Sequence, residues 1–95
     1  MSKHTLSAIA EEDLIQIYVE GATSFGLEQA RRYHQKLFQV FQFLAENPKA
    51  APIRPQLKTE IRVHPVESHI ILYKVRKQDI LVLRIRHAHE DWLNH

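Results

Sequence analysis

The stretch that decides the fold is the last third of the chain, IRVHPVESHIILYKVRKQDILVLRIRHAHEDW, residues 61–92. Within it, apolar and polar residues alternate with the period of two that indicates β-strands. The predicted strands cover residues 60–66, 69–76 and 79–87. The links at 67–68 and 77–78 are short enough for hairpins, so the strands should form an antiparallel meander.

Two amphipathic helices are predicted before these strands. A short strand over residues 5–7 leads into the first helix, and Ser7 is its predicted N-cap, because a serine hydroxyl can accept an orphan backbone N–H. The stripe of this helix is formed by Ala10, Leu14, Ile17 and Gly21. After a turn at Phe25–Gly26, a second helix runs from Leu27 to Glu46, and Asn47–Pro48 ends it. Its stripe is formed by Ala30, Tyr33, Leu37, Phe41 and Leu44. With so short a turn, the two helices should form an antiparallel hairpin.

This order of elements predicts a two-layer α+β domain, in which the helix stripes cover the apolar face of the sheet. The helix residues that we expect in the core are Leu14, Ile17, Leu37, Phe41 and Leu44. The sheet residues that we expect opposite them are Ile71, Tyr73, Leu81, Leu83 and Ile85. The other face of the last strand then carries Ile80, Val82, Arg84 and Arg86. We therefore expect the two arginines to point away from the helices or to line an open concave side of the sheet.

Size and composition restrict the class of protein. A chain of 95 residues predicts a single domain over residues 1–95. The absence of Cys excludes a disulfide framework, a thiolate metal site and a cysteine nucleophile. No apolar run has the length of a signal peptide core or the roughly 18 residues of a membrane span. We expect a soluble cytoplasmic protein that does not use a membrane.

Charge is distributed unevenly along the chain. The net charge is +2, but residues 1–50 hold 5 basic and 6 acidic residues, whereas residues 51–95 hold 8 and 5. The second part also holds 5 of the 7 histidines. A basic sheet surface indicates a charged partner, either nucleic acid or an acidic protein segment, although a solvated sheet face would have the same composition.

Two ordered sets of residues resemble a known family. The set in the first half is Leu6-Ser7, Ala10, Asp13-Leu14, Ile17, Phe25-Gly26, Ala30, Leu37 and Pro48. The set in the second half is Ile61-Arg62, Pro65-Val66, Ser68-His69, Tyr73, Ile80, Arg84-Ile85, His87 and Asp91. Together they span nearly the whole chain in order, and the chain resembles the ParE-type toxins of the RelE/ParE superfamily.

This resemblance implies a helix hairpin packed on a β-sheet, in agreement with the residue patterns. It also implies the toxin half of a type II toxin–antitoxin module, of the kind linked to plasmid stabilisation, with a ParD-like antitoxin as partner. Operator DNA would be reached only through the antitoxin. ParE-like members poison DNA gyrase, whereas RelE-like members cut messenger RNA on the ribosome.

The alternative activity, a ribosome-dependent mRNA endonuclease, would need a base, an acid and cations around the scissile phosphate. The residues that could supply them are Arg62, Arg84 and His87. The Lys/Arg cluster that such ribonucleases carry before the second strand is sparse here. The sequence therefore favours a toxin that binds its target without catalysis. A third possibility is a degenerate module that only binds its antitoxin.

The candidate residues for binding a target or partner gather toward the C-terminus. They are Arg62, Tyr73, Arg84, Arg86, His87, His89 and Trp92. Tyr73 could equally be a packing residue, and Trp92 could cap the sheet. His87 and His89 share a strand face, but two imidazoles without a third ligand do not make a metal site, so neither metal nor cofactor is predicted. We expect the segment from Arg84 to Trp92 to carry much of the toxicity.

Overall fold

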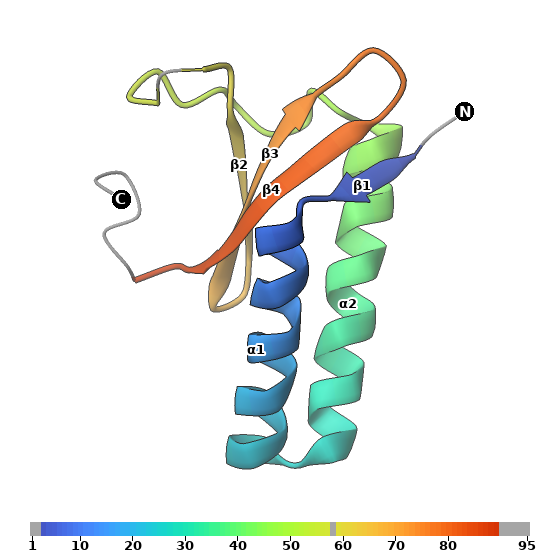
Figure 1. Ribbon diagram of the computed structural model, residues 1–95, viewed down its shortest axis with the longest axis vertical. Helices are drawn as coiled ribbons and strands as arrows, with labels where there is room; N and C mark the ends of the chain where they lie inside the picture. Colours follow the sequence, from blue (N-terminus) through green and yellow to red (C-terminus); the bar gives the residue numbers. More distant parts are fainter. Residues whose placement is uncertain (1–2, 58, 90–95) are drawn as a thin grey trace.

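The computed structural model describes residues 3–57 and 59–89, and its element order is the predicted one (Figure 1). The helices are α1 (Ala8–Phe25) and α2 (Leu27–Glu46). The strands are β1 (His4–Leu6), β2 (Arg62–Val66), β3 (His69–Val75) and β4 (Ile80–His87). The α+β fold is confirmed, and α2 has the predicted bounds. Neither helix is long and apolar enough to cross a membrane, nor is any other helix in the part of the chain described.

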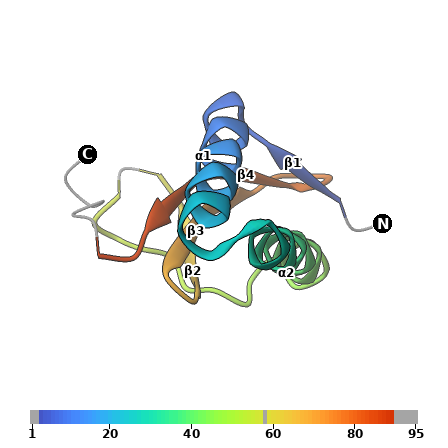
Figure 2. The same cartoon turned by 90° about the horizontal axis from the view of Figure 1, so that it is seen from below.

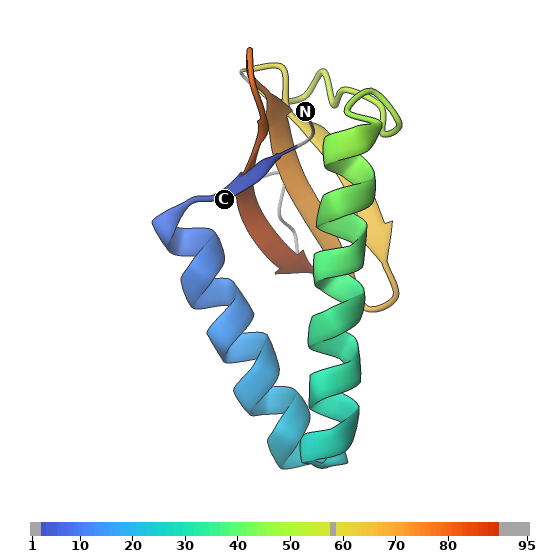
Figure 3. The same ribbon diagram turned by 90° about the vertical axis from the view of Figure 1, so that its right-hand side faces the viewer.

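The helix hairpin is defined by its caps. The hydroxyl of Ser7 accepts the backbone N–H of Ala10 at 3.0 Å, so the predicted N-cap of α1 is confirmed. Gly26 alone separates the two helices and has φ of 95°, a conformation that side chains with a Cβ rarely adopt. From this one-residue turn the helices diverge toward the sheet, as Figure 3 shows.

The four strands form one sheet in the order β1-β4-β3-β2. The last three strands are the predicted antiparallel meander, whereas β1 pairs with β4 in parallel, His4–Leu6 opposite Ile80–Val82. Strand β1 lies one residue earlier than predicted, because Ser7 turns into the helix and its N–H donates to the carbonyl of Val82 at 2.9 Å. Seen from below in Figure 2, α1 lies next to β4 and α2 lies to one side of the sheet.

The core lies between the helices and the sheet. The buried helix residues are Ala10, Leu14, Leu37, Phe41 and Leu44. The buried residues that the sheet contributes are Val66, Ile71, Tyr73, Ile80, Val82 and Ile85. The predicted core is confirmed for most members, while Ile17 is only partly buried at its margin.

The prediction for β4 was wrong at Leu81 and Leu83, which are only partly buried, while Ile80 and Val82 are in the core. The reason is a β-bulge. Leu72 pairs with Arg84, but Tyr73 pairs with Val82, so Leu83 is an extra residue without a cross-strand partner on β3. One extra residue reverses the alternation on either side of it, which a strict period of two cannot represent.

Beyond the bulge, Arg84 and Arg86 lie on the face of β4 away from the core. The expectation that both would point away from the helices was wrong for Arg84, because its guanidinium pairs with Asp13 of α1. Arg84 and Arg86 lie opposite Leu72 and Ile70, whose side chains form a second, smaller cluster on the other face of the sheet. That cluster consists of Val63, Ile70 and Leu72, with Ile61 and Ala88 packed against it.

Candidate functional site

A groove of about 700 Å³ lies between the helix hairpin and the end of the sheet at which β2 turns into β3 and β4 ends. Its polar wall includes Tyr33 and Lys36 of α2, Glu67 of the β2–β3 turn, and His69 and His87 of the sheet. Its apolar floor is formed by Ile17, Gly21, Phe25 and Ala30. The groove therefore joins titratable side chains to an apolar surface, and we call it the polar groove.

Tyr33 and His69 form a partly buried network in the polar groove. The hydroxyl of Tyr33 donates to the carbonyl of Val66 at 3.0 Å and lies 2.6 Å from Nδ1 of His69. Because the hydroxyl has one proton and a carbonyl only accepts, Nδ1 must be the donor to the tyrosine oxygen. Burial and the nearby carboxylate of Glu67 raise the pKa of Tyr33 to about 12, so it stays protonated at neutral pH.

Three imidazoles follow one another at the end of β4. His69 and His87 lie directly opposite in the β3–β4 register with ring centroids 5.2 Å apart, and the rings of His87 and His89 are 5.8 Å apart. Among residues 3–57 and 59–89, no group of three or more His, Cys, Asp or Glu side chains is arranged to hold a metal ion. The rings of His69 and His87 meet edge to face, and those of His87 and His89 are tilted against each other.

The β2–β3 turn brings a charge to the edge of the polar groove. Glu67 has φ of 51°, the left-handed conformation, which is strained for a residue with a Cβ. Its carboxylate forms an ion pair with Lys36 of α2, and both side chains are about half exposed. This pair ties the turn to the helix, although an ion pair in solvent is worth no more than about 1 kcal/mol.

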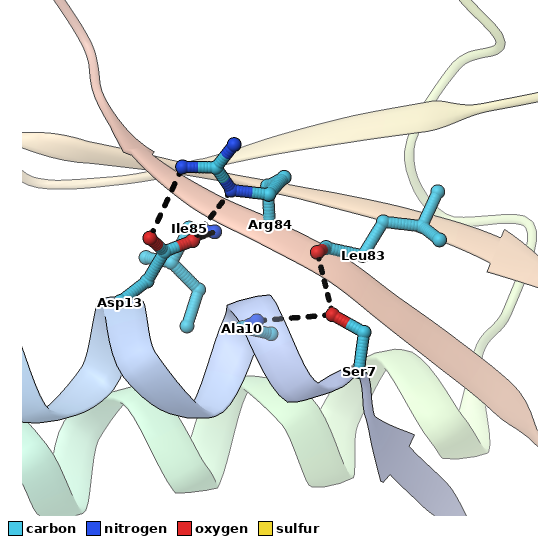
Figure 4. A network of polar contacts seen from close by, with 6 residues as sticks. All are labelled: Ser7, Ala10, Asp13, Leu83, Arg84 and Ile85. Carbon is cyan, nitrogen blue, oxygen red and sulfur yellow. Dashed lines mark hydrogen bonds and ion pairs between the residues drawn. The ribbon is translucent and has the colours of Figure 1, made fainter.

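The bulged half of β4 is fixed to α1 by two side chains (Figure 4). The carboxylate of Asp13 accepts Nε of Arg84 at 2.9 Å, Nη2 of Arg84 at 3.2 Å and the backbone N–H of Ile85 at 2.9 Å. Six residues earlier, at the N-cap of α1, the hydroxyl of Ser7 donates to the carbonyl of Leu83 at 2.8 Å. These contacts satisfy backbone groups along the stretch of β4 that β1 does not cover. We call this arrangement the α1 clamp.

A second groove, of about 360 Å³, is lined mostly by apolar side chains of the two helices. Leu14, Ile15 and Val19 come from α1, and Phe38 comes from α2. Ile15 and Val19 are 65% and 54% exposed, which is unusual for neighbouring aliphatic residues on one helix. We call it the apolar groove.

Comparison with known proteins gives the chain its family. The family described as "ParE toxin of type II toxin-antitoxin system, parDE" matches residues 5–92, which is nearly the whole chain. The chain belongs to the ParE toxin family. Toxin ParE1 of Caulobacter vibrioides is 28% identical over 87 residues, covering 92% of this chain and 90% of that protein. A structure titled "Chromosomal ParDE TA system from P. aeruginosa" has the same fold, with a TM-score of 0.78 at 22% identity over 92% of this chain and 96% of that one.

In this ParE-family chain, the residues considered for RNA cleavage are not brought together. Arg62 lies opposite Tyr73 and donates to the carbonyl of Ala51 at 2.7 Å. His87 lies opposite His69, four residues away along β3, a separation of about 13 Å along the strand. Arg84 is engaged by Asp13. Catalysis by Arg62, Arg84 and His87 at one phosphate is therefore not supported by their placement.

The remaining predicted residues divide into core and surface. Tyr73 is fully buried, burial raises its pKa, and its hydroxyl donates to the carbonyl of Pro48 at 2.8 Å, so it lies in the core. Arg86 and His87 are the last two residues of β4, and His89 follows two residues later; their role in binding stays a prediction. Trp92 lies outside the described residues.

Sequence reasoning missed two roles in this ParE-family fold. Tyr33 was interpreted as part of an apolar stripe, and only the structure shows its hydroxyl aimed at the β2–β3 turn. Asp13 was named only among the residues that carry the family resemblance, yet its partners are 71 and 72 residues away in the sequence. Its position before Leu14 on the inner side of the helix was the available signal, because an acid beside the buried stripe needs a partner.

Proposed function

We propose that this chain is the toxin of a two-gene module, that it inhibits DNA gyrase by binding, and that a ParD-like antitoxin neutralises it. The observation that supports binding over RNA cleavage is the separation of Arg62 from His87, together with the engagement of Arg84 by Asp13. General acid–base catalysis needs its groups within hydrogen-bond reach of one substrate. Gyrase works in the cytoplasm, so this proposal includes a cytoplasmic location.

The surface that we assign to the target is the end of β4, comprising Arg86, His87 and His89, together with the residues that follow. Arg84, two residues before Arg86 on the same face of β4, is held by Asp13 in the α1 clamp. A guanidinium pairs with carboxylate or phosphate in two parallel hydrogen bonds, so Arg86 suits an acidic protein surface or DNA held by gyrase. A toxin that acts in this way needs no proton transfer.

The test compares gyrase supercoiling with ribosome-dependent mRNA cleavage, using the purified chain in both assays. We expect inhibition of supercoiling and no cleavage. His87→Gln should weaken inhibition only a few-fold, whereas removal of residues 88–95 should abolish most of it and leave the fold intact by circular dichroism. His64→Gln, on β2 away from this surface, serves as the matched histidine control.

A ribonuclease predicts the opposite pattern. Loss of a general acid or base typically lowers a rate by about 10²–10⁴-fold. Codon-specific cleavage that His87→Gln removes, with supercoiling untouched, would overturn the gyrase proposal in favour of the endonuclease.

The apolar groove is our candidate for the antitoxin. Its exposed aliphatic residues lie between two helices, a surface on which an amphipathic helix can bury its apolar face. His34 and Glu11 are among its few polar lining residues, so the apolar contact should dominate. Disordered partners commonly fold on such grooves.

Thermal unfolding of the toxin with and without antitoxin tests this assignment. A ligand at about 100 times its Kd adds about 2.7 kcal/mol, so the complex should melt well above the free toxin. Val19→Glu should abolish the shift, whereas Glu12→Lys, exposed on the same helix and absent from the groove lining, should retain it. Equal melting temperatures at saturating antitoxin would contradict the proposal.

A further inference from the structure

The end of the sheet opposite the polar groove carries a concentration of positive charge. It is formed by Lys3, just before β1, and by Lys74, Arg76 and Lys77 of the β3–β4 hairpin. The four cations and the single carboxylate in these segments, Asp79, leave +3, which exceeds the +2 of the whole chain. The rest of the molecule is therefore slightly negative. We call this end of the sheet the lysine tip.

The strand register places Lys3 and Lys74 on one side of the sheet. The ring of His4 contacts Phe38 and Phe41, so His4 faces the helices, and its neighbours Lys3 and Thr5 face the other way. Leu81 of β4 pairs with Thr5 on β1 and with Lys74 on β3. Lys3 and Lys74 thus share the face that also carries Arg84 and Arg86 further along β4.

Hydrogen bonds to the carboxylate of Asp79 fix the β3–β4 hairpin in place. Arg76 donates Nε to Asp79 at 2.7 Å and Nη2 at 2.6 Å, and the hydroxyl of Thr5 donates to the same carboxylate at 2.6 Å. This network joins the hairpin to β1, and in Figures 1 and 3 the β3–β4 turn projects beyond the other strands. It also neutralises Arg76. The ammonium groups of Lys74 and Lys77 form no ion pair with any residue that the structure describes.

The chemistry of the lysine tip favours a phosphate backbone over an acidic protein. Its one guanidinium, the group suited to directional pairing with a carboxylate, is already used by Asp79. The three lysines act as flexible point charges, which suit the repeated phosphates of a nucleic acid. Residues 74–79 expose one large hydrophobic side chain, Val75, at 39%, and hold no aromatic residue that could anchor a protein interface.

We infer that the lysine tip binds the phosphate backbone of duplex DNA through Lys3, Lys74 and Lys77, without reading its sequence. A toxin that meets gyrase on DNA, or an operator through its antitoxin, would then also touch the duplex itself. This departs from the expectation that DNA is reached only through the antitoxin. It does not depend on the identity of the target, because the contact requires only the charges of the tip.

The experiment is fluorescence anisotropy of a labelled duplex of about 20 base pairs and arbitrary sequence, titrated with the purified chain at about 50–200 mM salt. Three phosphate contacts predict a slope of about −2.7 for log K against log salt, so a four-fold rise in salt weakens binding by about 40-fold. In the double variant Lys74→Ala/Lys77→Ala, the slope should fall to about −0.9, and affinity near 0.1 M salt should fall on the order of 50-fold.

The matched control removes two charges at the far end of the molecule, Arg31→Ala/Arg32→Ala, where both side chains are exposed on α2. We expect this control to keep the slope of the unchanged protein. Absence of binding, or equal losses in the two double variants, would overturn the inference. Binding of a labelled oligoglutamate as tightly as the duplex, with the same dependence on Lys74 and Lys77, would also overturn it and assign the tip to an acidic protein. Circular dichroism melts confirm that each variant is folded.

Discussion

The two halves of β4 are held in place by different means. Its first half, Ile80–Val82, lies between β1 and β3 and is fixed by backbone hydrogen bonds on both edges. Its second half, after the bulge at Leu83, does not pair with β1, and on that edge it is held by the α1 clamp. A backbone ladder tolerates most substitutions, whereas a clamp made by two side chains does not. The proposed target surface is built on the second half, which a single substitution can detach from α1 while its pairing with β3 remains.

The largest expected effect tests the bulge itself. Ile85→Ala should lower the free energy of unfolding by about 3 kcal/mol, because Ile85 is buried beyond the bulge. Leu83→Ala should cost no more than about 1 kcal/mol, since Leu83 is the extra residue and only partly buried. Urea unfolding of both variants measures the difference. Equal losses would mean that β4 continues with an unbroken period of two.

The next effect tests the α1 clamp. Asp13→Ala should cost about 2 kcal/mol, because it removes three hydrogen bonds and leaves Arg84 without its carboxylate. Glu12→Ala, on the exposed side of the same helix, is the control and should change stability by less than about 0.5 kcal/mol. Hydrogen exchange should show the amides of β4 after Leu83 losing protection in Asp13→Ala, while those of Ile80–Val82 keep theirs. Uniform loss along the strand would contradict the division into halves.

A smaller effect is expected at the start of the clamp. Ser7→Ala removes the N-cap of α1 and the hydrogen bond to the carbonyl of Leu83, and should cost about 1 kcal/mol. Thermal melts of Ser7→Ala beside Ser7→Thr provide the measurement. Threonine keeps the hydroxyl, so it should recover most of the loss. A threonine variant as unstable as the alanine variant would assign the effect to packing instead.

The smallest effect concerns the first half of β4, near the hairpin. Hydrogen bonds from Arg76 and Thr5 lower the pKa of Asp79 to about 2 from its ordinary value of 3.8. A depressed carboxyl pKa stabilises the fold above the unfolded value, and this contribution is lost as the pH falls from about 4 to about 2. Asp79→Asn should therefore flatten the loss of stability over that interval, measured by denaturant unfolding at several pH values. An unchanged pH profile would show that Asp79 does not contribute.

Local signals in the sequence predicted the helices well. Ser7 at the start of α1, Gly26 between the helices and Asn47–Pro48 after α2 are backbone signals that act on their immediate neighbours. The stripes of the helices were correct for the same reason, since Leu14, Leu37 and Phe41 follow the helical period and are all buried.

The features that the sequence did not predict depend on distant residues. The bulge at Leu83 is stabilised by Ser7 and Asp13, which lie at the other end of the chain. Tyr73 is of a residue type that is common in binding sites, but its hydroxyl donates to the carbonyl of Pro48 and the residue belongs to the core. A pattern within one strand contains no information about such partners, so the alternation on β4 and the role of Arg84 required the structure.

The parallel pairing of β1 with β4 has a consequence for the synthesis of the protein. Ser7 and Leu83 are 76 residues apart, and at about 5–20 residues per second a ribosome needs roughly 4–15 s to reach the second after making the first. During that interval β1 has no strand to pair with, and the first turns of α1 have no sheet to hold. Long-range pairings of this kind slow folding, because the loop must close before the contacts form. The newborn chain therefore gains its complete sheet and the α1 clamp only after β4 has been made.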